Sequence, residues 1–145
     1  MVSRERIVVG GDTTPSATAA LRWAVEEAAR KHHTSVLVVH AFDVEGRADL
    51  ALERDLDRCR RDARYRTQSW VVEVLSDSAL EVPVLVQTPD ASVEDALAAA
   101  AVNASMVVIG EPQSGHRQDL AARLSQRVLC PVVTVGADHE TALAG

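Results

Sequence analysis

The sequence predicts one α/β domain, built as a three-layer open sandwich: a five-stranded parallel sheet with helices on both faces. First, five short apolar runs alternate along the chain with four segments whose apolar residues recur at helical spacing. Second, the runs are apolar throughout, as expected for parallel strands that are covered on both faces. Third, 145 residues with 47% hydrophobic side chains suffice for one core, and Val, Leu and Ala must fill it because aromatic residues make up only 3%.

The first third of the chain is predicted to form a strand, a helix and a second strand. Ile7–Val9 is a short β-branched run that two glycines close. Thr14 is a good helix cap and Pro15 suits the first helical position, so a helix begins here and keeps small apolar residues on one face as far as Ala28. Val36–Val39 has the composition of a second buried strand.

The longest helical pattern runs from Leu50 to Leu75. Its apolar residues repeat at spacings of three, four or seven, which is typical of one buried helix face. Six arginines and five acidic residues are mixed within the same segment. Mixed signs at such spacing predict a solvated face with weak ion pairs, and not an anion-binding patch.

The rest of the chain predicts three strands and two helices. The strands are Val82–Val86, Met106–Ile109 and Pro131–Val135. Ser92 and the acidic residues after it fit a capping box that opens an alanine-rich helix, and Asn103 lies near the end of that helix. The last helix is marked by Leu120, Leu124 and Val128.

Charge and composition narrow the class of protein. The formal net charge is −6, which argues against a nucleic-acid binder, since such proteins need clustered Lys and Arg. Cys59 and Cys130 lie far apart and outside any metal-binding motif, so both are expected to be free thiols.

No run approaches the roughly 18 apolar residues of a membrane span, and no signal peptide is recognised, so we expect a cytoplasmic protein. We expect residues 1–137 to form the domain and residues 138–145 a polar tail.

The predicted architecture also nominates a site. In open parallel sheets, ligands bind outside the carboxyl ends of the strands, where the strand order reverses. This geometry selects Gly10–Thr14, His40–Phe42 and Gly110–Gly115. Helix N-termini at such an edge favour anions. His116, in the last of these loops, is the histidine we regard as a candidate contact, whereas His40 is expected to be a hydrogen-bonded structural residue.

The known enzyme motifs with this architecture are missing from the sequence. It contains no Gly-Lys pair of a P-loop, no G-x-G-x-x-G after the first strand and no G-x-S-x-G elbow. Lys31 is the only lysine, so the lysine of a phospho-accepting receiver domain is also lacking. The segment Val9–Thr14 is nearer to the S-G-G-x-D-S loop of ATP pyrophosphatases, but it lacks the leading serine and its Asp12 comes one place early.

Four segments together resemble the universal stress protein family. They are Ile7–Ser16 with the following Ala20–Ala24, then Val38–Ala41, Val107–Gly110 and Cys130–Val133. The order and spacing of the elements agree over essentially the whole chain. The resemblance implies a fold of the adenine nucleotide alpha hydrolase type, a stress-response role and a homodimer, often through the last strand, here Val132, Val133, Thr134 and Val135. The use of arginine and alanine in place of lysine and isoleucine indicates a bacterial source.

The resemblance also implies a place for ATP. ATP-binding members use an acidic residue after the first strand, matching Asp12, and backbone after the second strand, matching Ala41. Their phosphate loop has the form G-x2-G-x9-G-[ST]. The residues that match the nucleoside side are Gly11, Asp12, Thr13 and Ala41, and those that match the loop are Gly110, Gln113, Ser114, Gly115, Ala122 and Arg123.

The phosphate loop departs from that pattern. Gly110 supplies the first glycine, but Gln113 stands in place of the second. The final Gly-Ser or Gly-Thr pair is replaced by Ala122-Arg123, or by Arg123-Leu124 if residues are simply counted. Glycines let a backbone approach phosphate oxygens closely, so their loss weakens ATP binding. Glu111 adds negative charge, while Ser114-Gly115 offers a substitute turn and Arg117 or Arg123 a cation.

Three functions are compatible with these observations. The first is a stress-related regulatory protein, dimeric and without catalysis, that interacts with a partner protein and binds ATP weakly or not at all. The second is an adenine-nucleotide switch with slow ATP hydrolysis. The third is a small-molecule carrier that uses the same crevice. We expect no firmly bound cofactor and, if a ligand binds, one with fewer phosphates than ATP.

Overall fold

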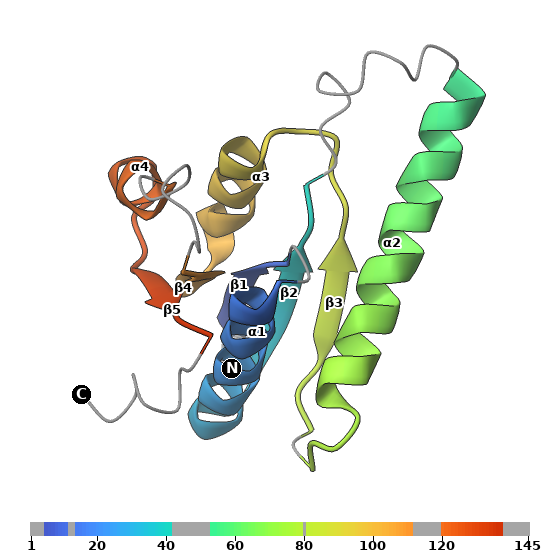
Figure 1. The fold of residues 1–145 in the computed structure, drawn as a ribbon. Helices are drawn as coiled ribbons and strands as arrows, with labels where there is room; N and C mark the ends of the chain where they lie inside the picture. The colour runs from blue at the N-terminus through green and yellow to red at the C-terminus, as the bar shows by residue number, and fades with distance from the viewer. Residues whose placement is uncertain (1–4, 12–13, 42–52, 80, 112–119, 138–145) are drawn as a thin grey trace.

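The computed structural model describes residues 5–11, 14–41, 53–79, 81–111 and 120–137. Of residues 53–56 it describes the backbone only. Strands and helices alternate along the chain (Figure 1), in the order that the sequence predicts. The elements are β1 (Glu5–Gly10), α1 (Pro15–Lys31), β2 (Thr34–Val39), α2 (Glu53–Leu75), β3 (Val84–Gln87), α3 (Val93–Ala100), the 3-10 turn η1 (Ala101–Asn103), β4 (Met106–Gly110), α4 (Leu120–Arg127) and β5 (Val132–Val135).

All five strands are parallel and lie in the order β3-β2-β1-β4-β5. Val8 of β1 is in register with Leu37 of β2 on one side and Val107 of β4 on the other. The strand order therefore reverses between β1 and β4, and β3 and β5 are the two edges. This confirms the predicted α/β fold.

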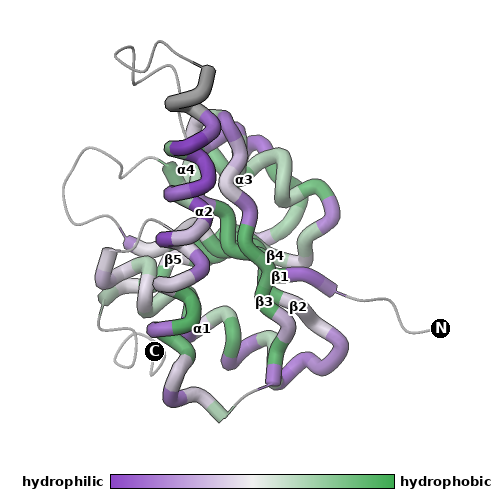
Figure 2. The backbone as a smooth tube through the Cα atoms, turned by 90° about the vertical axis from the view of Figure 1, so that its right-hand side faces the viewer, coloured by the Kyte–Doolittle hydropathy of each residue, from purple (hydrophilic) through white to green (hydrophobic). Residues whose placement is uncertain are grey.

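The helices form a layer on each face of the sheet. Ile7 and Val9 point into a core shared with α1 and α2, while Val8 points into a second core shared with α3 and α4. In Figure 2 the strands form the apolar centre between the helical layers. The prediction of a core without many aromatics is confirmed, since its largest fully buried side chains include Ile7 and Leu21.

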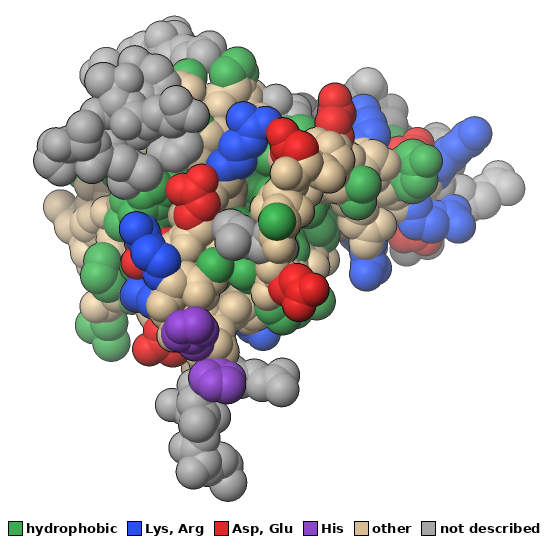
Figure 3. All heavy atoms as spheres, turned by 90° about the horizontal axis from the view of Figure 1, so that it is seen from below, with side chains coloured by type: hydrophobic (Ala, Val, Ile, Leu, Met, Phe, Trp, Pro, Cys, Tyr) green, Lys and Arg blue, Asp and Glu red, His purple; other side chains and the backbone are tan. Residues whose placement is uncertain are grey.

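Local signals explain how α1 begins and ends. The Thr14 hydroxyl accepts a hydrogen bond from the Ala17 amide at 3.2 Å, and Pro15 occupies the first turn, as predicted. After Lys31 the backbone turns sharply, with positive φ angles at His32 and His33. These two histidines are exposed and lie where α1 ends, and Figure 3 shows histidine side chains on the surface of the molecule seen from below.

Some boundaries differ from the predictions. The third strand is Val84–Gln87 instead of Val82–Val86, and as an edge strand it leaves Leu85 52% exposed. The alanine-rich helix ends at Ala100, because the chain tightens into η1 before Asn103. The described part of the long helix is Glu53–Leu75, and its predicted start at Leu50 lies outside the described residues.

The solvated face predicted for α2 is confirmed. Arg58, Arg61 and Arg64 are exposed, and Arg60 contacts Asp57 of α2 and Asp90 beyond β3. Figure 3 shows basic and acidic side chains interspersed on the projecting part of the molecule. In the part of the chain that the structure describes, no helix combines the length and apolar composition needed to cross a membrane.

Candidate functional site

The reversal of strand order brings together the ends of β1 and β4, as the sequence analysis expected. Gly10 ends β1 and Gly110 ends β4, and the two strands are hydrogen-bonded neighbours. The segment after β2, at His40 and Ala41, flanks β1 on its other side. Several predicted site residues lie outside the described residues, namely Asp12, Thr13, Gln113, Ser114 and Gly115, and so do His116 and Arg117.

On the β2 side, the backbone beyond β1 is held in a fixed position. The Gly11 amide donates to the Val39 carbonyl at 3.0 Å, and Nδ1 of His40 lies 2.5 Å from the Gly11 carbonyl. A Cβ atom at Gly11 would lie 2.7 Å from Cγ1 of Val38 and 3.2 Å from Cζ3 of Trp70, so a larger residue does not fit without movement. Hence His40 is a hydrogen-bonded structural residue, as predicted, and it positions Gly11 beside the half-buried Ala41.

On the β4 side, Gly110 lies directly against the first turn of α1. A Cβ atom there would be 2.6 Å from Oγ of the buried Ser16 and 2.7 Å from the Ala17 amide nitrogen. Such distances require the helix backbone to shift. Gly110 therefore has a packing reason to be glycine, in addition to the close approach to phosphate that the sequence analysis assigned to it.

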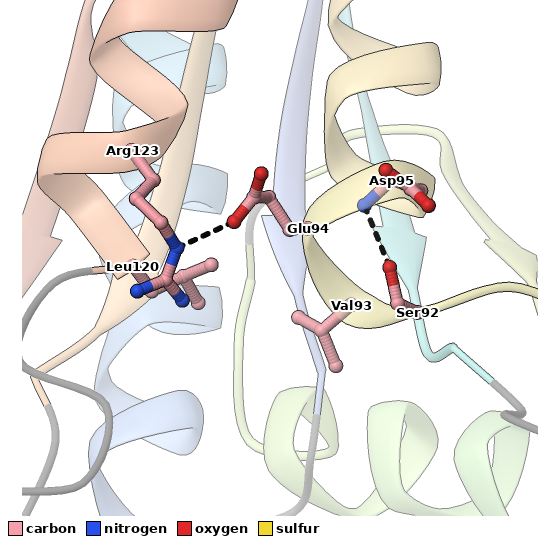
Figure 4. A pocket seen from close by; sticks show the side chains of 6 residues that line it. All are labelled: Ser92, Val93, Glu94, Asp95, Leu120 and Arg123. Carbon is pink, nitrogen blue, oxygen red and sulfur yellow. Dashed lines mark hydrogen bonds and ion pairs between the residues drawn. The ribbon is translucent and has the colours of Figure 1, made fainter.

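A cavity of about 370 Å³ opens between the first turns of α3 and α4. This volume falls within the range of roughly 300–1,000 Å³ that is common for small-molecule sites. Val93 and Leu120 supply its apolar walls, and Figure 4 shows Arg123 of α4 reaching across toward α3. The remaining lining residues are Ser92, Glu94 and Asp95.

Charged side chains join the two helices at this cavity. Nε of Arg123 donates to Oε1 of Glu94 at 2.5 Å, the contact drawn in Figure 4. Nη1 of Arg127 donates to Oε2 of Glu94 at 2.7 Å and to Oδ1 of Asp95 at 2.9 Å. We call these four residues the α3–α4 clasp. Within it, hydrogen bonds from Arg123 and then Arg127 lower the pKa of Glu94, and those from Arg127 and then Ser92 lower the pKa of Asp95.

The cavity contains one predicted site residue and several that sequence reasoning missed. Arg123 lines it, whereas Ala122 beside it is exposed and does not. The sequence pattern assigns Glu94 and Asp95 only to helix capping, and the Ser92 hydroxyl does accept a hydrogen bond from the Asp95 amide at 3.2 Å. Their partners on α4 are about thirty residues away, so no local pattern reveals the ion pairs. Among the residues that the structure describes, no cluster of His, Cys, Asp or Glu is suited to hold a metal ion.

Comparison with known proteins connects this fold to a family. The model of the universal stress protein family matches residues 3–136. A universal stress protein from Archaeoglobus fulgidus is 26% identical, with a TM-score of 0.59 over 90% of this chain and 92% of that one. No curated protein sequence matches.

Two solved structures with bound nucleotides share the fold. A universal stress protein in complex with cAMP has a TM-score of 0.67 at 17% identity, over 94% of this chain and 100% of that one. The Archaeoglobus fulgidus protein in complex with dAMP has a TM-score of 0.60 at 24% identity, over 92% and 98%.

Proposed function

Because the chain belongs to the universal stress protein family, we propose that it is a dimeric stress-response regulator that acts through a partner protein and not by catalysis. Its crevice takes an adenine nucleoside or a nucleotide with fewer phosphates than ATP, and binds ATP weakly or not at all. The solved structures with the same fold that carry cAMP and dAMP support a monophosphate at such a site.

The observation that carries this proposal is that the guanidinium of Arg123 is already bonded to Glu94. Family members close their phosphate loop with a glycine and a hydroxyl residue at the start of the last helix, where this chain has Ala122 and Arg123. The guanidinium is the obvious replacement for an anion contact, but its Nε is bonded to Glu94. An incoming triphosphate would therefore meet a cation that is already neutralised, while the β2 side keeps an ordered backbone at Gly11 and Ala41.

Thermal unfolding in the presence of ligands tests the proposal. A ligand well above its dissociation constant stabilises the native state. We expect millimolar adenosine or AMP to raise the melting temperature and ATP with Mg²⁺ to raise it less. Mass spectrometry of the contents released from purified protein should find no stoichiometric ATP. Stoichiometric retention of ATP, or its hydrolysis by the protein, would overturn the proposal.

The dimer is proposed to form through β5. The carbonyls of Pro131 and Val135 accept hydrogen bonds from β4, so the alternation of a strand directs the amides of Val132 and Thr134 toward the open edge. A second β5 pairing antiparallel with the first would satisfy these amides and blunt the edge. Leu129, just before β5, is fully exposed, which supports an apolar contact at this edge.

A proline in β5 tests this interface. Thr134→Pro removes an outward amide and should convert the dimer to a monomer in analytical ultracentrifugation. Leu85→Gln, on the opposite edge strand β3, serves as the control and should leave the mass unchanged. A monomeric wild-type protein, or a dimer that survives Thr134→Pro in a folded protein, would contradict this interface.

A further inference from the structure

In the α3–α4 clasp, carboxylates of the same chain are bonded to the two arginines that could otherwise bind an anion at the cavity. Glu94 uses both of its carboxylate oxygens, Oε1 for Arg123 and Oε2 for Arg127. The Ser92 hydroxyl is also engaged, because it caps the Asp95 amide. The two arginines that could bind a phosphate here are thus already bonded to a carboxylate of the same protein, although the cavity has the volume of a ligand site.

The cavity lies one helical turn from the end of β1. Leu97 follows Glu94 by three positions on α3, and a Cβ atom at Gly10 would lie 3.7 Å from Cδ1 of Leu97. Leu97 is buried in the core between α3 and the sheet, so its packing fixes the distance between α3 and Gly10. Helix α3 therefore lines the cavity with its first turn and lies against the end of β1 with Leu97, one turn further on.

We propose that Glu94 is the specificity-determining residue of this crevice: it acts as an internal counter-ion that occupies Arg123 and Arg127 and so excludes phosphate-rich ligands. This inference rests on the proposed function, because it concerns the ligand class of the same site. Charge-assisted bonds between guanidinium and carboxylate are stronger than neutral ones, and a phosphate must displace them before it can bind. Glutamine at position 94 has the same size but no charge, so it leaves Arg123 without its carboxylate partner, while Arg127 keeps its bond to Asp95.

Inorganic pyrophosphate is the probe, because its binding does not depend on an adenine contact. Isothermal titration calorimetry at low salt should show at least tenfold tighter binding to Glu94→Gln than to the wild-type protein, and added salt should weaken it. Glu26→Gln is the matched control: it removes one negative charge from an exposed position on α1. The double variant Glu94→Gln/Arg123→Gln should lose the gain.

Three results would overturn the inference: no gain in Glu94→Gln, an equal gain in Glu26→Gln, or a gain that survives in the double variant. Circular dichroism checks that each variant is folded, and Glu94→Ala replaces the glutamine variant if that one is not. Adenosine is titrated in parallel as a separate arm. If adenosine fails to bind while the pyrophosphate gain appears, the proposed function fails and the role of Glu94 stands.

Discussion

The two helical layers are attached to the sheet in different ways. Helices α1 and α2 have 17 and 23 residues, and both tryptophans of the chain pack in this layer. Nε1 of Trp70 on α2 donates to Oγ1 of Thr18 on α1 at 3.2 Å, which ties the two helices together. Helices α3 and α4 have only eight residues each, contribute alanines and leucines to their core, and are joined by exposed ion pairs.

The candidate site lies between α3 and α4, in the layer whose helices are shorter. Truncating a buried leucine costs about 2–5 kcal/mol, whereas an exposed ion pair contributes about 0–1 kcal/mol. Helices α1 and α2 together supply more buried apolar side chains to the core than α3 and α4 do, so we expect the α1–α2 layer to contribute more to stability, and the cavity lies in the other layer. Regions of low local stability are where ligand-binding elements are commonly found.

The largest expected effect compares one leucine from each layer. Leu21 of α1 and Leu124 of α4 are both fully buried. Leu21→Ala should lower the free energy of unfolding toward the upper end of about 2–5 kcal/mol, and Leu124→Ala toward the lower end, because the short α4 can move inward to fill the space. Urea unfolding followed by circular dichroism measures both. Equal losses would mean that the layers do not differ in this respect.

The second prediction compares two glycines at the ends of neighbouring strands. Gly110→Ala places a methyl group against the backbone of α1 and should cost about 1–3 kcal/mol. Gly10→Ala is the control, because its nearest neighbour would be a side-chain atom of Ile109 at 3.4 Å, an ordinary contact. This variant should be neutral or slightly stabilising, since alanine restricts the unfolded chain. Thermal unfolding of the two variants checks the prediction, and an equal loss in both would contradict it.

The third prediction concerns the bond between α1 and α2. Thr18→Val keeps the shape of the side chain but leaves Nε1 of Trp70 without its acceptor. The cost should be about 1 kcal/mol, at the lower end for an unsatisfied donor, because both residues are only half-buried. Tryptophan fluorescence and urea unfolding report the change. Trp70→Phe combined with Thr18→Val should show no further loss from the threonine change.

The smallest expected effect is the dependence of the α3–α4 clasp on pH. The folded-state pKa values of Glu94 and Asp95 are lowered, so their contribution to stability is present above the ordinary carboxyl pKa and is lost as pH falls through the folded-state values. The stability difference between wild type and Glu94→Gln should be small at pH 7 and vanish in acid or in molar salt. A difference that persists in acid would show that the carboxylate charge is not its cause.

Much of this fold was predictable because its signals are local or periodic. The run Ile7–Val9 and the cap at Thr14 were placed correctly from a few neighbouring letters, and the apolar strands indicated the parallel sheet. The third strand was placed two residues early, because the run from Val82 is apolar but Pro83 has no amide hydrogen to donate and the register with β2 begins at Val84. Edge strands give weaker patterns, since one of their faces is partly solvated.

The candidate site was predictable only in position. Strand order follows from topology rules, so the ends of β1 and β4 could be named in advance. The contacts there depend on residues far apart in the chain. Nothing near Arg123 in the sequence shows that Glu94 is its partner, and nothing near Gly110 shows that Ser16 lies against it.

Through its contact with Gly110, helix α1 connects the crevice at the carboxyl ends of the strands with the opposite end of the sheet, where the strands begin. No side chain separates the end of β4 from the first turn of the helix, so a ligand that displaces one must displace the other. Helix α1 ends at the turn of His32 and His33, where the His33 carbonyl accepts the Glu5 amide. Helix α1 therefore spans the sheet from the crevice at the carboxyl ends of the strands to their amino ends, where the histidine pair is exposed.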